Sequence, residues 1–84
     1  MESRIAVVSI LVEDIESAGL VNDLLHLYGQ YVVARMGVPY REKGISIICV
    51  VMDAPGDITS ALSGKLGMLS GVSSKTIATK AKTV

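Results

Sequence analysis

The chain has 84 residues, half of them apolar, yet it contains no Phe or Trp and only three Tyr. Eight basic residues balance eight acidic ones, which excludes the strong overall charge that would attract nucleic acid or an anionic membrane. The lone Cys49 excludes an internal disulfide and a CxxC motif, as in proteins of a reducing cytoplasm. We therefore expect one small cytoplasmic domain with an aliphatic core.

The sequence contains the same pattern twice, in Arg4–Arg35 and in Gly44–Lys75. Each copy has an apolar strand, an acid-led helix, a glycine turn and a second strand. Two such units joined by a hairpin predict an α+β ferredoxin-like βαββαβ sandwich, with two helices on one face of a four-stranded antiparallel sheet. A single domain is expected over residues 1–84, with residues 80–84 as a frayed tail.

The first strand, Arg4–Val12, is apolar at nearly every position, which indicates a central strand covered on both faces. It meets Glu13 too soon for a signal peptide or a membrane span. Asp14 is a predicted N-cap for a helix that Gly29 ends. The apolar side chains expected to face the core are Ala18, Val21, Leu24, Leu25 and Tyr28.

Further strands are predicted at Tyr31–Val38, Gly44–Met52 and Val72–Thr79, with a charged connection at Pro39–Lys43. A second helix is expected to end at Gly67 or Gly71. Its residues at core-facing helical spacing are Ile58, Ala61, Leu62, Lys65, Leu66 and Leu69. Because two central strands are apolar on both faces and the helices cover only one, we expect a homo-oligomer, a dimer at least, whose second subunit covers the sheet.

The segment Arg35–Lys43 holds three cations, one acid and one tyrosine within nine residues, and Gly37 and Pro39 restrict its shape. One interpretation is an element that binds an anion or a protein partner. The alternative is a solvated edge that blocks unwanted strand pairing. The candidate binding residues are Arg35, Tyr40, Arg41 and Lys43.

A second candidate is Asp53-Ala-Pro-Gly-Asp57, where Pro and Gly predict a turn into the second helix. The turn is either purely structural or a backbone cradle for a small polar ligand. In the second case the site residues are Asp53, Gly56 and Asp57.

The sequence offers few residues that could act in catalysis or bind a metal ion. His26 is predicted to be a solvated helix residue and Cys49 a buried small apolar one, so we expect no metal site and no cofactor. The acids Glu13, Asp14 and Glu16 are explained by helix capping rather than by acid–base work. No nucleophile, base and orienting group can be assembled, so an enzyme is not expected.

Over nearly its whole length the sequence resembles the small regulators associated with the iron-only hydrogenase system, a family allied in fold to ACT domains and to the C-terminal domain of nickel-responsive repressors. The resemblance rests on Ser9–Asp14, Leu25–Gly29, Arg35–Lys43, Ser46–Ile48, Asp53–Asp57 and Ala61–Gly67. It implies an ACT-like, oligomeric regulatory or ligand-sensing module rather than an enzyme. The strand histidines that bind nickel in the repressors are missing, so nickel binding does not carry over. Neither does the separate DNA-binding domain, and no direct DNA contact is expected.

The expected function is therefore a cytoplasmic regulator of the iron-only hydrogenase system. It would self-associate and either sense a small-molecule effector or dock a protein of that system, away from the membrane. The alternative is a non-sensing structural adaptor in hydrogenase assembly.

Overall fold

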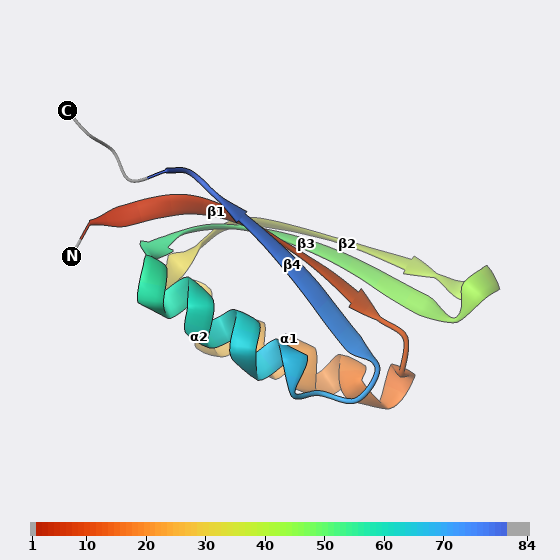
Figure 1. Cartoon of the computed structure of the whole chain (residues 1–84). Coiled ribbons are helices and arrows are strands. Elements are labelled where there is room, and N and C mark those ends of the chain that lie inside the picture. The colour runs from red at the N-terminus through yellow and green to blue at the C-terminus, as the bar shows by residue number, and fades with distance from the viewer. Residues whose placement is uncertain (1, 81–84) are drawn as a thin grey trace.

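The computed structural model describes residues 2–80, so most of the tail expected at residues 80–84 lies outside the described residues. The strands and α-helices are β1 (Ser3–Val12), α1 (Ala18–Leu27), β2 (Val32–Tyr40), β3 (Ile45–Pro55), α2 (Gly56–Gly67) and β4 (Val72–Ala78). Short 3-10 helices join them at η1 (Ile15–Ser17), η2 (Gly29–Tyr31) and η3 (Arg41–Lys43). Both α-helices lie against one face of the sheet (Figure 1), which confirms the predicted α+β sandwich.

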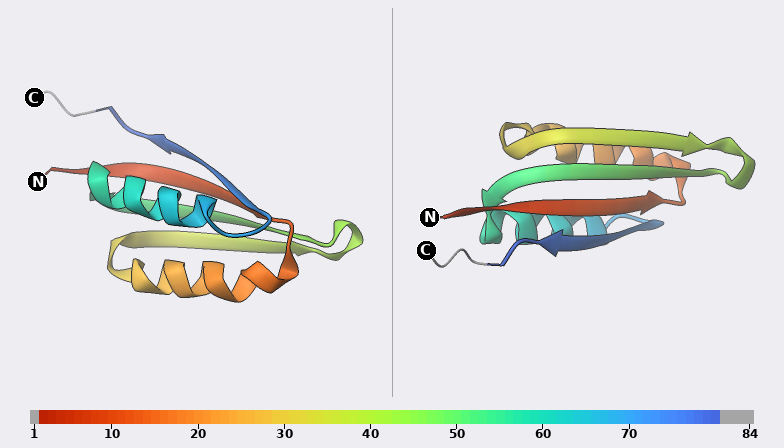
Figure 2. Two further views of the ribbon diagram at one scale, coloured as in Figure 1. Left: turned by 60° about the horizontal axis from the view of Figure 1, so that its bottom comes forward. Right: turned by 90° about the horizontal axis from the view of Figure 1, so that it is seen from above.

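The sheet has the strand order β2-β3-β1-β4, with every neighbouring pair antiparallel. β1 and β3 therefore lie in the centre, as the density of apolar residues predicted. They pair from Ser3↔Pro55 to Val12↔Ser46. Figure 2 (right) looks onto the sheet from the side without helices, with β2 and β4 at its two edges. The β2–β3 hairpin projects past the end of α1 (Figure 1).

The core lies between the sheet and the helices and is almost entirely aliphatic. Alternate residues of the two central strands enter it, and Val21, Leu25, Leu62 and Leu66 meet them from the helices. Those strand residues are Val8, Ile10, Val12, Ile48, Val50, Met52 and Ala54. The helix positions predicted from periodicity are thus confirmed except at Ala61 and Lys65, which are exposed, while Thr59 is buried instead. Burial of each large apolar side chain contributes about 1.5–3 kcal/mol.

The junction between β1 and α1 is tied to the loop after α2. Asp14 caps η1 by accepting a 3.0 Å hydrogen bond from the Glu16 amide, so the predicted cap is confirmed, although α1 itself begins only at Ala18. The Glu13 amide donates to the carbonyl of Gly71 at 2.7 Å. Gly71 has φ 68°, and a Cβ at this position would lie 2.6 Å from the Asp14 Cβ. Only glycine allows this approach.

The predicted turn at Asp53–Asp57 is wrong. β3 continues through Pro55 and α2 begins at Gly56, without a side-chain cap. The strand is longer because β1 pairs with it as far as Ser3↔Pro55 and because Met52 and Ala54 continue its buried alternation. In the same way β2 runs through Tyr40, beyond the predicted end at Val38, because Val38, Pro39 and Tyr40 have partners on β3.

Candidate functional site

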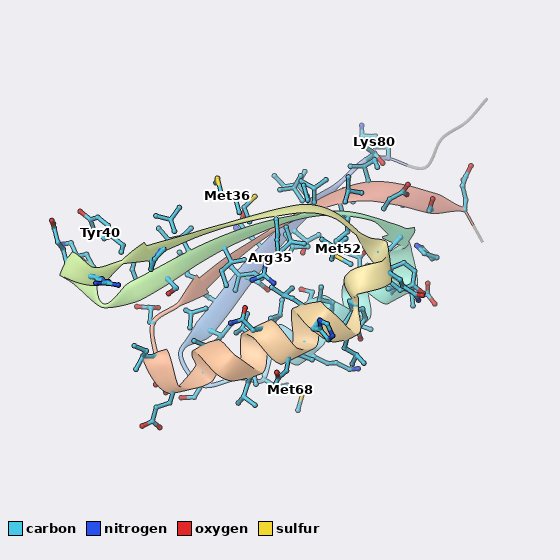
Figure 3. The ribbon with its side chains drawn as sticks, turned by 180° about the vertical axis from the view of Figure 1, so that it is seen from behind. Arg35, Met36, Tyr40, Met52, Met68 and Lys80 are labelled. Carbon is cyan, nitrogen blue, oxygen red and sulfur yellow. The ribbon has the colours of Figure 1, made fainter. Side chains whose placement is uncertain are left out.

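The four candidate residues of the hairpin do not form one site. Arg35 lies in the middle of β2, opposite Val50, and its side chain points toward the helix layer (Figure 3). Met36, the next residue, points to the opposite side of the sheet. Arg41 and Lys43 lie in η3 at the exposed tip. Arg35 therefore lies well back along the strand from the tip that carries Arg41 and Lys43.

Arg35 is held in place by the first helix. Its Nη2 donates a 2.9 Å hydrogen bond to Oδ1 of Asn22, thirteen residues earlier in the chain. Asn22 and His26 are four residues apart on α1, so both side chains lie on the same side of the helix. The helix thereby brings His26, which the sequence did not connect with any binding residue, close to Arg35.

These residues line a groove of about 510 Å³ between α1 and β2. Its complete lining is Asn22, Asp23, Leu25, His26, Gly29, Val32 and Arg35. The groove thus combines one fixed cation, an imidazole, an amide and a carboxylate with apolar walls. Such a mixture is suited to a small polar ligand, with the guanidinium as the strongest hydrogen-bond donor. We call it the α1–β2 groove.

Tyr40 and Arg41 line a second and smaller hollow of about 160 Å³ at the base of the tip. Its other lining residues are Val12, Ile15, Pro39, Gly44, Ile45 and Ser46. The Tyr40 hydroxyl donates to Glu42 Oε2 at 3.3 Å, so Glu42 engages the tyrosine. Lys43 is exposed and lines neither hollow.

The second candidate, at the end of β3, is not assembled as a cradle. Asp53 is an exposed strand residue opposite Ile5, Gly56 is the first residue of α2, and Asp57 lies in the first turn of that helix. None of the three lines the α1–β2 groove or the hollow at the tip. The segment forms no turn, because α2 begins at the residue that directly follows the end of β3.

His26 and Cys49 lie in different parts of the fold. His26 faces the α1–β2 groove, whereas Cys49 is half-buried on β3 beside Met36 of β2. Within residues 2–80, no three His, Cys, Asp or Glu side chains are close enough to share a metal ion. No described helix has the length and apolar character needed to cross a membrane.

The face of the sheet away from the helices carries a continuous set of apolar side chains, which we call the open face. The register places them on four neighbouring strands: Ile5, Val7, Leu11, Met36, Val38, Ile47, Cys49, Val51 and Ile77. Met36 is 61% exposed and Ile77 76% exposed. Nothing in the described chain covers this face.

A family model matches residues 4–76, and its description reads "Iron-only hydrogenase system regulator, putative". The chain belongs to this TM1266-like family. The resemblance inferred from the sequence motifs is thereby confirmed. Membership supports the coarse description of a regulator of that hydrogenase system.

A solved structure similar to the chain is that of the uncharacterized protein TM1266 from Thermotoga maritima. The two sequences are 44% identical, the match covers 94% of this chain and 100% of that chain, and the TM-score is 0.89. No curated protein matches the chain. The similarity to the solved structure supports the TM1266-like fold over nearly the whole chain. The α1–β2 groove and the open face are features of this chain's own structure.

Sequence reasoning found Arg35 but missed Asn22, Asp23 and His26 as its neighbours. The hydrogen bond to Asn22 spans a helix and a strand that are separated by η2, and no local spacing rule relates such positions. One signal was present in the TM1266-like sequence. Alternation along an edge strand places a long charged side chain such as Arg35 on the side that faces the helices, where it can reach a polar side chain of the neighbouring helix.

Proposed function

We propose that this TM1266-like chain is a homo-oligomeric regulatory module of the iron-only hydrogenase system that acts in the cytoplasm by binding and not by catalysis. The observation that carries the proposal is the open face. A domain of this size buries only about 60% of its unfolded surface, so its isolated stability is modest. A second copy packed on the open face would remove Met36, Ile47, Leu11 and their neighbours from water.

Self-association through one face has a simple geometry. A two-fold dimer uses the same patch on both subunits. The open face is apolar over most of its area, with Ser9 in the middle of β1, Lys75 on the edge strand β4 and Asp53 near one end. This agrees with the anatomy of protein interfaces, in which an apolar core lies within a polar rim. The interface would be aliphatic, because the described face has no Phe or Trp.

Binding is favoured over catalysis by the separation of the reactive side chains. Cys49 lies on the open face and His26 on the helix side, so the sheet lies between the only thiol and the only imidazole. A nucleophile and a base need to be within hydrogen-bond reach, and these are not. The free thiol is compatible with the reducing cytoplasm.

The oligomer is tested by size-exclusion chromatography with light scattering on two matched variants. Ile47→Glu places a charge on the open face at a central strand, where Ile47 lies between Leu11 and Val38. Met68→Glu places the same charge on the outer side of the helix layer, where Met68 is 85% exposed. We expect Ile47→Glu to dissociate the oligomer and Met68→Glu to leave it intact. If both variants remained oligomeric, the proposed interface would be contradicted.

A sensing module and a structural adaptor differ in their response to small molecules. A sensor is stabilised by its effector through mass action, by about 2.7 kcal/mol at one hundred times the dissociation constant. We therefore expect a saturable thermal shift with one member of a panel of amino acids, nucleotides, small anions and metal ions. An adaptor would show no such shift and would instead bind a purified hydrogenase maturation protein.

A further inference from the structure

We propose that the α1–β2 groove binds a compact anion through Arg35 and His26, the anionic group being a carboxylate or a phosphate. The proposal deepens the regulatory function above and rests on it for the consequence of binding, since the anion would be the effector. The binding itself does not depend on the oligomer. Both residues line the groove, from β2 and α1 respectively.

The groove exists because β2 does not fill the space beneath α1. β2 is exposed along almost all of its length, with only Val32 half-buried. Its register places Arg35 and Gly37 on the side that faces the helices, opposite Val50 and Ile48. Gly37 has no side chain and Arg35 is hydrogen-bonded at its tip, so neither residue fills the gap with an apolar side chain. The helix-facing side of β2 is therefore open, whereas the helix-facing sides of β1 and β3 are packed into the core.

Arg35 is ordered before any ligand arrives. A guanidinium has five N–H donors, and within residues 2–80 the side chain of Arg35 makes one hydrogen bond, to Asn22 Oδ1. The remaining donors are available to a ligand in the groove. Because Asn22 fixes the side chain, less conformational entropy is lost on binding. A planar guanidinium pairs with carboxylate or phosphate through two parallel hydrogen bonds.

His26 and Asp23 narrow the class of ligand. His26 adds an imidazole donor one turn from Asn22, and Asp23 adds a carboxylate to the same groove. The carboxylate of Asp23 repels the charge of any anion in the groove, so the favoured ligand carries a hydroxyl or other donor beside its anionic group that can donate a hydrogen bond to Asp23. The Gly29 wall leaves room, since a Cβ added there would meet nothing within 4 Å.

Another role for an inward-pointing charge on an edge strand is to prevent pairing with other strands. That role needs the charge of Arg35 alone, and it makes no use of His26 or of the groove. If Arg35 only prevents strand pairing, an anion titration should give no saturable shifts in the groove. If Arg35 binds an anion together with His26, it should give them.

The test is a backbone-amide NMR titration of the whole chain with inorganic phosphate, and separately with glycolate, at constant ionic strength. We expect saturable shifts at Asn22, His26, Gly29 and Arg35. Arg35→Gln should raise the dissociation constant about tenfold or more, the usual consequence of losing a charge-assisted hydrogen bond. His26→Gln should raise it less. Arg41→Gln, which removes the same charge at the hairpin tip, should leave it within about twofold.

The probe that binds identifies the anionic group. Shifts with phosphate alone indicate a phosphate site, shifts with glycolate alone a carboxylate site, and shifts with both a site that accepts either group. Arg35→Lys retains the charge and loses the planar fork, and its dissociation constant should rise as well, which keeps the test valid if Arg35→Gln folds poorly. Equal weakening by Arg35→Gln and Arg41→Gln, or no shifts in the groove with either probe, would overturn the site. The mass of the same samples reports the oligomer independently, so failure of one proposal is distinguished from failure of the other.

Discussion

Arg35 Nη2 on β2 lies 2.9 Å from Asn22 Oδ1 on α1, and this hydrogen bond joins the edge strand to the helix that borders the α1–β2 groove. It is the only side-chain to side-chain hydrogen bond between a strand and an α-helix in residues 2–80. An arginine that would otherwise move freely is thereby directed along the groove. The relationship makes Asn22 a positioning residue for the proposed site.

Asn22→Ala should weaken anion binding without unfolding the protein. The lost hydrogen bond is exposed and contributes about 0.5–1 kcal/mol, while alanine favours the helix interior over asparagine by up to about 0.7 kcal/mol. The two effects nearly cancel, so urea unfolding should change by less than about 0.5 kcal/mol. The dissociation constant for the bound probe should still rise, because Arg35 is no longer fixed. A stable variant with unchanged affinity would remove Asn22 from the site.

Gly71→Ala should destabilise the fold strongly. Gly71 has φ 68°, and its added Cβ would lie 2.8 Å from the Asp14 backbone nitrogen, so backbone strain and a steric clash act together. We expect a loss of more than about 2 kcal/mol in the free energy of unfolding. Gly44→Ala is the matched control, since Gly44 has φ 66° with nothing within 4 Å of the added Cβ. It should cost only about 1 kcal/mol. Equal losses in the two variants would show that the contact with Asp14 is unimportant.

Thr76→Val should stabilise the protein. The Thr76 Oγ1 is the one buried side-chain polar atom without a hydrogen-bond partner within residues 2–80. Burying an unpartnered hydroxyl costs about 1–3 kcal/mol, whereas valine has the same shape and favours strands. We expect a gain of about 1 kcal/mol in urea unfolding. Thr79→Val, at an exposed position, should change stability by less than about 0.5 kcal/mol. A loss of stability in Thr76→Val would mean that the hydroxyl is satisfied by water.

The architecture could be predicted because hydrophobic periodicity and strand composition are local signals. β1 and β3 were recognised as central from apolar runs alone, and Val21 and Leu25 as core residues from helical spacing. These features depend on residues that are neighbours along one element.

The candidate site could be predicted only in part because it depends on pairing between elements. Pro39 suggested that β2 would end early, yet an edge strand accepts proline where no ladder hydrogen bond is needed. The charges of Arg35–Lys43 were correctly singled out, but the alternation of side chains along a strand separates Arg35 from the tip. Its contact with Asn22 is a tertiary feature with no sequence periodicity.

The open face yields the most direct test, which is the mass of the wild-type chain in solution. Sedimentation equilibrium at micromolar concentration should give a dimer or a larger homo-oligomer, because the apolar side chains of β1, β2, β3 and β4 that face away from the helices need a cover. A stable monomer of 8.8 kDa under these conditions would contradict the account.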